Sequence, residues 1–322
     1  MTVITLTRPK LEELLRIEDC FDAITDAYIA VSDGRCVLPP VGYLDFAQAN
    51  GDCHIKYGHI QGDPSFVIKV ATGFYDNPAK NLPSSNGIVL VLSALTGQIE
   101  AILQDEGYLT DLRTGLGVAI ATKALCRPDS TCIGIVGTGI QARYQIRCLE
   151  KIMPENTLEF TVWGRSDDHM QQLASDMRLA GIPVAMQPNL QMLCERSDII
   201  LTATPAKSPL VKSSWIMPGT HITASGADTP GKQELETGLI ARADLLVLDK
   251  IDQCFDHGEV ATAQAQGILN TDNIVELGHV LAGTARGRQQ KKDITIADLT
   301  GLGSQDIAIA QVALGAYRQN TT

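Results

Sequence analysis

The chain has 322 residues, of which 44% are hydrophobic and 20% are charged, and its formal net charge is −11. This length usually divides into two domains, and the negative charge disfavours nucleic acid and anionic membrane surfaces as partners. No segment resembles a secretion signal or a membrane span, and the eight cysteines are scattered without a C-x-x-C pair, which predicts a cytoplasmic protein with reduced thiols.

The first third of the chain begins with a helical pattern and continues with strand patterns. Apolar residues recur every three to four positions over residues 8–33, which predicts one helix. Short β-type runs separated by turn sequences follow at 41–46, 53–60, 66–72, 88–93 and 100–103. They predict an antiparallel or small barrel-like sheet packed on helices. A helix rich in small residues, which starts near Thr110 and runs to Leu125, would connect two domains.

Residues 131–142 carry the most informative motif, an apolar β-branched run followed by Gly-x-Gly-x-x-Ala. Gly137 permits a tight turn, Gly139 lets the backbone approach a pyrophosphate, and Ala142 keeps the next helix close to the sheet. The N-terminus of that helix then binds the phosphates. The motif predicts a dinucleotide site, and a glycine turn without a ligand is the alternative.

From this motif onward strand and helix patterns alternate. Strands are predicted at 131–136, 158–163, 183–186, 198–202, 220–224 and 244–248, and helices at 140–152, 167–181 and 189–196. This alternation predicts a doubly wound parallel sheet of the α/β class. The last apolar helix, 306–318, would make the first domain discontinuous if it packs back on that domain.

The end of the second strand of this unit bears on cofactor preference. Arg165 and Ser166 occur where NADP sites bind the 2′-phosphate, and arginine suits phosphate recognition. The neighbouring Asp167 and Asp168 could instead bind the ribose of NAD, and dual use also remains open. NADP(H) is the favoured cofactor.

Residues 225–232 directly follow the apolar strand at 220–224. Because open α/β sheets bind ligands beyond the carboxyl ends of their strands, Asp228 falls where a nicotinamide ring is expected. An aspartate there can act as general acid or base. The alternatives are an Asx-turn or helix cap for Asp228 and a solvated surface role for Lys232.

The first domain supplies cationic side chains. Lys69 lies within an apolar run, where a charge is costly unless it is paired or functional; an outward-facing lysine is the alternative. His54 and Lys56 share one face of their strand and could bind a carboxylate, although a histidine in such a place can also be structural. Arg113 precedes the connecting helix, where it can reach cofactor or substrate. The spacing of His and Cys predicts no zinc site, and no Gly-x-Ser-x-Gly nucleophile motif occurs.

Five stretches together resemble the ornithine cyclodeaminase/mu-crystallin family: Gly73-Phe-Tyr-Asp-Asn-Pro with Leu82-Pro-Ser-Ser, Asp111-Leu-Arg-Thr-Gly, the glycine motif, Gly226-Ala-Asp-Thr-Pro-Gly-Lys-Gln-Glu-Leu, and Thr300-Gly-Leu-Gly-Ser-Gln-Asp-Ile-Ala. The resemblance implies an α/β protein with a Rossmann-type doubly wound parallel sheet at 117–305. It also implies a discontinuous α+β substrate-binding and dimerisation domain formed by 1–116 and 306–322, and a homodimer.

The resemblance further implies roles for individual residues. Lys69 and Arg113 would bind the substrate carboxylate, Lys69 would also polarise the keto or imino group, and Asp228 would be the acid/base. The cofactor would be lined by Ser84, Arg113, Thr114, Gly137, Gly139, Ile140, Gln141, Arg165, Ser166, Thr204, Ala227, Lys232 and Gly301.

One departure from the cyclodeaminase pattern bears on the substrate. The early substrate strand of cyclodeaminases resembles one with an arginine for the carboxylate and a glutamate for the substrate amine, whereas this chain has His54 and Lys56 there. An ammonium in place of a carboxylate disfavours a diamino acid and favours an anionic second group. The pattern is therefore closer to the ectoine-utilisation and iminosuccinate reductase members.

These residues predict an NAD(P)H-dependent reductase of a small 2-imino acid, or of a keto acid plus ammonia, giving an L-amino acid. Reduction of iminosuccinate to aspartate is one such reaction. One alternative is redox-neutral deamination with bound NAD, as in cyclodeaminases. Another is a non-catalytic NADP-binding carrier of the mu-crystallin type.

Overall fold

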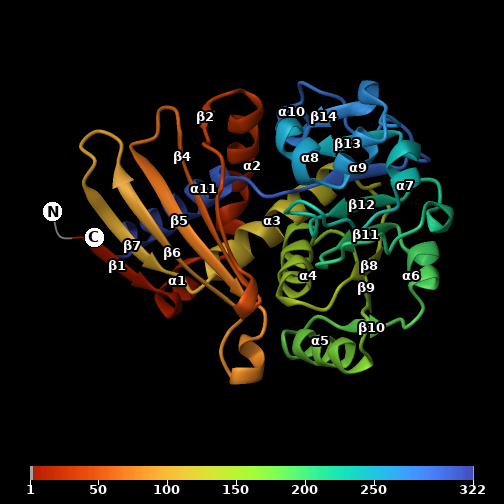
Figure 1. The fold of residues 1–322 in the computed structure, drawn as a ribbon, viewed down its shortest axis with the longest axis horizontal. Helices are drawn as coiled ribbons and strands as arrows, with labels where there is room; N and C mark the ends of the chain where they lie inside the picture. The colour runs from red at the N-terminus through yellow and green to blue at the C-terminus, as the bar shows by residue number, and fades with distance from the viewer. Residues whose placement is uncertain (1–2, 322) are drawn as a thin grey trace. The chain divides into compact units, whose positions relative to one another are not determined.

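The computed structural model describes residues 3–321, which form two compact units (Figure 1). The first unit contains the chain up to Arg113 and again from Leu302, and the second contains Thr114–Gly301. Both boundaries lie a few residues from those predicted at 116/117 and 305/306. The first unit is discontinuous because the C-terminal helix α11 (Gly303–Thr321) belongs to it.

The first unit contains a seven-stranded sheet in the order β1-β7-β6-β5-β4-β2, with β3 also paired to β4. Its strands are β1 (Ile4–Thr7), β2 (Cys36–Val37), β3 (Gly42–Phe46), β4 (Gly51–Ile60), β5 (Ser65–Phe74), β6 (Ser85–Ser93) and β7 (Ile99–Gln104). The predicted strands pair antiparallel, as expected for an antiparallel sheet, but β1, which was not predicted, pairs with β7 in parallel at one edge. This four-residue strand starts the chain and carries too little pattern to be predicted.

The helices of this unit cover one face of the sheet. Helices α1 (Arg8–Leu14) and α2 (Ile17–Ser32) replace the single helix predicted over 8–33, because Leu15 and Arg16 are extended. Leu11 and Leu14 before this break and Cys20 and Ile24 after it are all buried, so the spacing of apolar residues continues across the break and does not reveal it. Helix α11 packs on α2, β4 and β5, and Figure 1 shows it running along the strands.

The two faces of this sheet differ in burial although both are apolar. Val67 and Val89 point toward the helices and are buried. Their neighbours Ile68, Val70 and Leu90 point the other way and are only partly buried.

The second unit is a parallel eight-stranded sheet in the order β10-β9-β8-β11-β12-β15-β13-β14. Its strands are β8 (Cys132–Val136), β9 (Glu159–Trp163), β10 (Val184–Met186), β11 (Ile199–Thr202), β12 (His221–Ala224), β13 (Leu245–Leu248), β14 (Ile274–Glu276) and β15 (Thr295–Asp298). The predicted Rossmann-type α/β fold is confirmed. Strand order reverses between β8 and β11, and ligands of such sheets bind at that switch point.

Helix α3 (Tyr108–Leu125) contains the boundary between the two units. The other helices of the second unit are α4 (Ile140–Ile152), α5 (Asp167–Leu179), α6 (Leu190–Arg196), α7 (Thr237–Arg242), α8 (Ile251–His257), α9 (Val260–Ala265) and α10 (Leu277–Leu281). Among residues 3–321 we find no helix with the length and apolar character needed to cross a bilayer.

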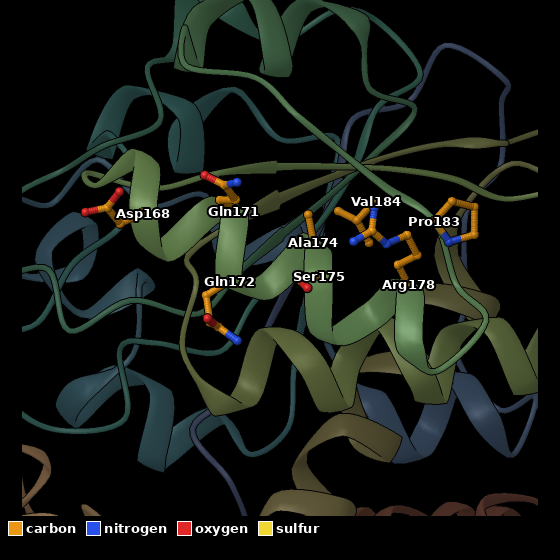
Figure 2. Close-up of a pocket in the computed structure, with 8 residues that line it drawn as sticks. All are labelled: Asp168, Gln171, Gln172, Ala174, Ser175, Arg178, Pro183 and Val184. Atoms are coloured by element: carbon orange, nitrogen blue, oxygen red, sulfur yellow. The ribbon is translucent and has the colours of Figure 1, made fainter.

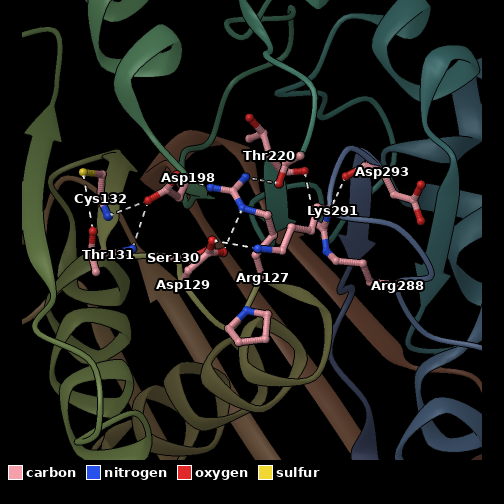
Figure 3. Close-up of polar contacts among 12 residues, drawn as sticks. Arg127, Asp129, Ser130, Thr131, Cys132, Asp198, Thr220, Arg288, Lys291 and Asp293 are labelled. Carbon is pink, nitrogen blue, oxygen red and sulfur yellow. Dashed lines mark hydrogen bonds and ion pairs between the residues drawn. The ribbon is translucent and has the colours of Figure 1, made fainter.

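A polar network ties the start of β8 to its neighbours, as Figure 3 shows. The Asp198 carboxylate receives a hydrogen bond from Arg127 Nη2 at 2.5 Å and others from the backbone N–H groups of Thr131 and Cys132 at 2.9 and 3.1 Å. Arg127 also donates to the carbonyl oxygen of Gly219 at 2.7 Å. The strand that leads into the glycine turn is therefore anchored at its beginning by a charged pair.

Candidate active site

The glycine turn between β8 and α4 has the geometry of a phosphate cradle. Gly137 has a φ of +128°, and a Cβ atom there would lie 2.6 Å from the carbonyl oxygen of Ala203. Gly139 is the N-cap of α4, and no described atom lies within 4 Å of the place where its Cβ atom would be. Because no described side chain caps this helix, its first N–H groups are available to an anion. These residues fit the pyrophosphate of a dinucleotide.

Two further residues shape this turn. Arg143 donates from Nη1 to the carbonyl oxygen of Thr138 at 2.6 Å and from Nε to Asp176 at 2.9 Å. It holds the carbonyl side of the turn so that N–H groups are left for a ligand, a role that the sequence pattern did not indicate. Ile140 begins α4 and is 46% exposed, which is unusual for isoleucine and fits a predicted cofactor contact.

The predicted ribose end of the site follows β9. Arg165 is exposed, and among the described residues its guanidinium makes no hydrogen bond or ion pair. The Ser166 hydroxyl caps α5 by accepting a hydrogen bond from the N–H of His169 at 3.4 Å. Asp167 and Asp168 are exposed in the first turn of α5. The arrangement leaves Arg165 free to bind a phosphate.

A separate pocket of about 540 Å³ lies beside α5 and the start of β10 (Figure 2). Its lining is mainly polar and consists of Asp168, Gln171, Gln172, Ala174, Ser175, Arg178, Pro183 and Val184. The glycine turn and Arg165 do not line it, and Figure 2 shows side chains of α5 together with Pro183 and Val184 from the segment that follows it. We treat it as a polar surface groove outside the cofactor cradle.

The loop that follows β12 brings two predicted site residues together. Lys232 Nζ lies 2.6 Å from Asp228 Oδ1, and the Asp228 side chain is 50% exposed. Ala227 beside it is buried. The predicted acid/base is thus on an accessible loop at the carboxyl end of a strand, paired with a cation from its own loop.

In the first unit, Lys69 and Arg113 meet at one carboxylate, that of Asp306 on α11. Lys69 Nζ lies 2.8 Å from Asp306 Oδ1, and Arg113 Nε lies 3.2 Å from the same oxygen. The Lys69 side chain is only 3% exposed, so the outward-facing alternative is wrong. Thr110 Oγ1 accepts a weaker hydrogen bond from Lys69 at 3.3 Å.

Burial and charge act in opposite directions on these groups. Burial lowers the pKa of Lys69 to about 8, although the Asp306 carboxylate opposes this change. Burial also opposes ionisation of Asp306, but the Lys69 and Arg113 cations outweigh it and hold the pKa of this carboxyl below its usual range. Asp306 was not predicted from the sequence, although it lies in the C-terminal motif, as an aspartate within an apolar helix.

The other two predicted substrate-binding residues, His54 and Lys56, lie on β4, next to the strand that carries Lys69. Lys56 is directly opposite Lys69 in the antiparallel register of β4 and β5. His54, two residues earlier on the same face, lies 3.6 Å from Asp52 and packs edge-on against Tyr43, with ring centroids 5.1 Å apart. The structure therefore brings Lys56, Lys69 and Arg113 around one fully buried carboxylate.

The remaining predicted cofactor residues are distributed over both units. Ser84 is partly buried before β6, Thr114 and Gln141 lie on α3 and α4, and Thr204 follows β11. Gly301 has a φ of +82° and donates its N–H to the buried Asp249 at 2.7 Å. In the described part of the chain, no group of three or more His, Cys, Asp or Glu side chains could hold a metal ion.

Comparisons with known proteins place this geometry in a family. The model of the ornithine cyclodeaminase/mu-crystallin family matches residues 2–319. The curated relative y4tK of Sinorhizobium fredii, an uncharacterised cyclodeaminase, is 37% identical over 97% of this chain and 95% of its own.

Three solved structures are similar over nearly their whole length. An archaeal alanine dehydrogenase dimer with bound NAD is 30% identical, covers 100% of this chain and 98% of its own, and has a TM-score of 0.90. The Δ1-pyrroline-2-carboxylate reductase of Thermococcus litoralis, in complex with NADH and L-proline, is 26% identical, with 99% of both chains covered and a TM-score of 0.91. The iminosuccinate reductase of Paracoccus denitrificans with NAD⁺ is 28% identical, with 99% and 97% covered and a TM-score of 0.89.

Proposed function

The chain belongs to the ornithine cyclodeaminase/mu-crystallin family, and from this premise we propose that it reduces a small 2-imino acid to an L-amino acid. The similar structures include two reductases and a dehydrogenase with NAD or NADH bound. The chain is a nicotinamide-dependent oxidoreductase that acts on carbon–nitrogen bonds. The substrate and the choice of NADPH over NADH are the proposed parts.

The observation that carries the proposal is the buried pair of cations around Asp306. Lys69 and Arg113 carry two positive charges toward one oxygen of this carboxylate, which leaves positive charge for a substrate carboxylate. Arginine binds carboxylates through its planar set of donors, and a buried lysine adds a strong point charge. Preorganised cations of this kind also stabilise negative charge that develops during a reaction.

The second unit would supply the cofactor site and the proton. The turn at Gly137 and Gly139 would hold the pyrophosphate, and the bound cofactor supplies a hydride for the imine carbon. Asp228, exposed on its loop after β12, would transfer a proton at the substrate nitrogen.

We further propose a substrate with a second acidic group. Lys56 adds a third cation next to Lys69. The three cations Lys56, Lys69 and Arg113 therefore exceed the single negative charge of Asp306. A dicarboxylic imino acid such as iminosuccinate satisfies this excess, whereas the second ammonium of a diamino acid would be repelled.

NADPH is the proposed cofactor because Arg165 is exposed at the end of β9 and has no described partner. The 2′-phosphate would provide that partner.

We also propose that two copies of the chain associate through the open face of the first sheet. Ile68, Val70 and Leu90 are apolar there and only partly buried, and Tyr57 on the same face is 43% exposed. A broad apolar face without helices is typical of an interaction surface. The similar alanine dehydrogenase is a dimer.

A direct assay tests the proposed reaction. Purified protein is mixed with NADPH or NADH and with oxaloacetate plus ammonia, pyruvate plus ammonia, or a cyclic 2-imino acid, and loss of the reduced cofactor is followed. We expect the fastest turnover with NADPH and oxaloacetate plus ammonia, and loss of turnover in Asp228→Asn with the fold retained. Absence of cofactor oxidation with every substrate would reject the proposal, and release of ammonia from ornithine without net oxidation would assign a cyclodeaminase instead.

A further inference from the structure

The loop that carries Asp228 is closed at its base by the side chain of Glu234. Glu234 Oε1 accepts hydrogen bonds from the backbone N–H and the hydroxyl of Thr204, each at 2.7 Å. Oε2 accepts from the hydroxyl of Thr202 at 2.6 Å and from the N–H of Gly226 at 2.8 Å. One carboxylate therefore joins the end of β11 to both ends of the Asp228 loop.

The surroundings of this carboxylate leave little freedom. A Cβ atom at Gly226 would lie 2.4 Å from Glu234 Oε2 and 2.4 Å from the carbonyl oxygen of Thr204. Glu234 is fully buried, and burial raises its pKa against the hydrogen bonds from Thr202 and Thr204 that favour the ionised form. All four hydrogen bonds are donated to the carboxylate, by Thr202, Thr204 and Gly226, a pattern that the amide of a glutamine cannot accept in full.

A second buried carboxylate fixes the position of Glu234 itself. The backbone N–H of Glu234 donates to Glu259 Oε1 at 2.7 Å, and that of Leu235 donates to Glu259 Oε2 at 2.9 Å. Glu259 stands at the start of α9. Buried polar networks in which every acceptor is used rigidify their surroundings. The base of the loop is thus tied to the body of the second unit.

We infer that Glu234 is a positioning residue of the reductase, which fixes the loop that presents Ala227 and Asp228 to the nicotinamide. The inference rests on the proposed function and names the group that keeps the acid/base in place. Asp228 has one described side-chain partner, Lys232 of the same loop, so its position depends on how the loop base is held. Glu234 acts through this loop and does not touch the reacting atoms.

The test compares Glu234→Gln with the matched control Glu236→Gln. Glu236 lies two residues further along, and its carboxylate accepts a hydrogen bond from the N–H of Ser213 at 2.7 Å, outside the Asp228 loop. Thermal unfolding, the Kd of NADPH from its fluorescence, and kcat and its pH profile are measured for both. We expect Glu234→Gln to lower kcat at least tenfold, weaken NADPH several-fold and alter the pH profile. Glu236→Gln should stay within twofold of the wild type.

A purely structural role predicts a different result. A lower Tm of Glu234→Gln with kcat, pH profile and NADPH Kd all within twofold of the wild type would overturn the inference. If Glu234→Gln does not fold, Thr202→Val decides, because it removes one donor and keeps the side-chain shape. A threefold or greater fall in kcat supports the inference, and an unchanged kcat rejects it. If the wild type binds NADPH but reduces no imino acid, the proposed function fails, while the NADPH Kd and fluorescence spectrum still test whether Glu234 orders the loop.

Discussion

Lys56 and Lys69 lie directly opposite each other on the antiparallel strands β4 and β5. Like charges in this position repel each other. The nearby Lys56 cation indeed adds to the effect of burial in lowering the pKa of Lys69. A bound anion relieves this repulsion, so the pair favours a substrate that carries more than one negative charge.

Replacing Lys56 by Gln should change substrate selectivity more than overall activity. We expect kcat/KM for a dicarboxylic imino acid to fall about tenfold or more, the order of one lost hydrogen bond to a charged group. The value for a monocarboxylic imino acid should change less than about threefold, since that substrate lacks the second carboxylate. Lys10→Gln, on the surface helix α1, is the control. An equal fall in kcat/KM for both substrates would show that Lys56 does not bind the second acidic group.

Substrate affinity should weaken as the pH rises through about 8. Lys69 binds the carboxylate only as a cation, and burial lowers its pKa to about 8. The cation is present below this pH and is lost above it, so KM should rise on the alkaline side. The measurement is KM against pH from 6 to 10, with Lys69→Arg as comparison, because arginine keeps its charge over this range. A KM that is flat through pH 9 in the wild type contradicts the assignment.

Asp306→Asn should shift that pH dependence to lower pH and destabilise the fold. The Asp306 carboxylate raises the pKa of Lys69, so its removal lets Lys69 lose its proton earlier. The variant also leaves two buried cations without their partner, a change that typically costs about 3–5 kcal/mol of unfolding free energy. Adding Lys69→Met to Asp306→Asn should recover part of the Tm. An unshifted KM profile in the single variant would mean that Asp306 does not control Lys69.

The sequence pattern predicted the strands that consist mainly of apolar residues. Strands β8, β9 and β11 are short apolar runs between turns, and their predicted and observed limits differ by a single residue at most. Strand β15 is equally buried, yet it contains Thr295 and Asp298, whose polar groups are bonded inside the fold. These polar residues weaken the apolar pattern of β15, and the sequence pattern did not predict this strand.

Prediction of the candidate site from the sequence was limited in a similar way. Lys69 could be singled out because a charge interrupts an apolar run. Its partner Asp306 is separated from it by 237 positions in the sequence, and Glu234 and Thr202, which are hydrogen-bonded, are separated by 32 positions. An acidic residue that acts by accepting hydrogen bonds from distant segments looks like any other acidic residue until the fold places its donors.

Arg165→Ala should reduce the preference for NADPH. We expect the Kd of NADPH to rise about tenfold, in line with the loss of a charge-assisted hydrogen bond to phosphate. The Kd of NADH should change less than about twofold, because NADH lacks the 2′-phosphate. Arg178→Ala removes an exposed arginine of α5 outside the cradle (Figure 2) and controls for net charge. Tighter binding of NADH than NADPH by the wild type would assign the ribose to Asp167 or Asp168.

A charge placed on the open face of the first sheet should separate the proposed dimer. Val70 is in the middle of β5 and points away from the helices, where it is only partly buried. Val70→Glu would bury an unpaired carboxylate in the contact between two copies, which is costly, whereas in a monomer the side chain reaches water. Light scattering should report a dimer for the wild type and a monomer for Val70→Glu. Leu95→Glu adds the same charge at a turn residue that is 89% exposed and should remain dimeric. A wild type that is monomeric at micromolar concentration, or a dimeric Val70→Glu, would place the interface elsewhere or exclude it.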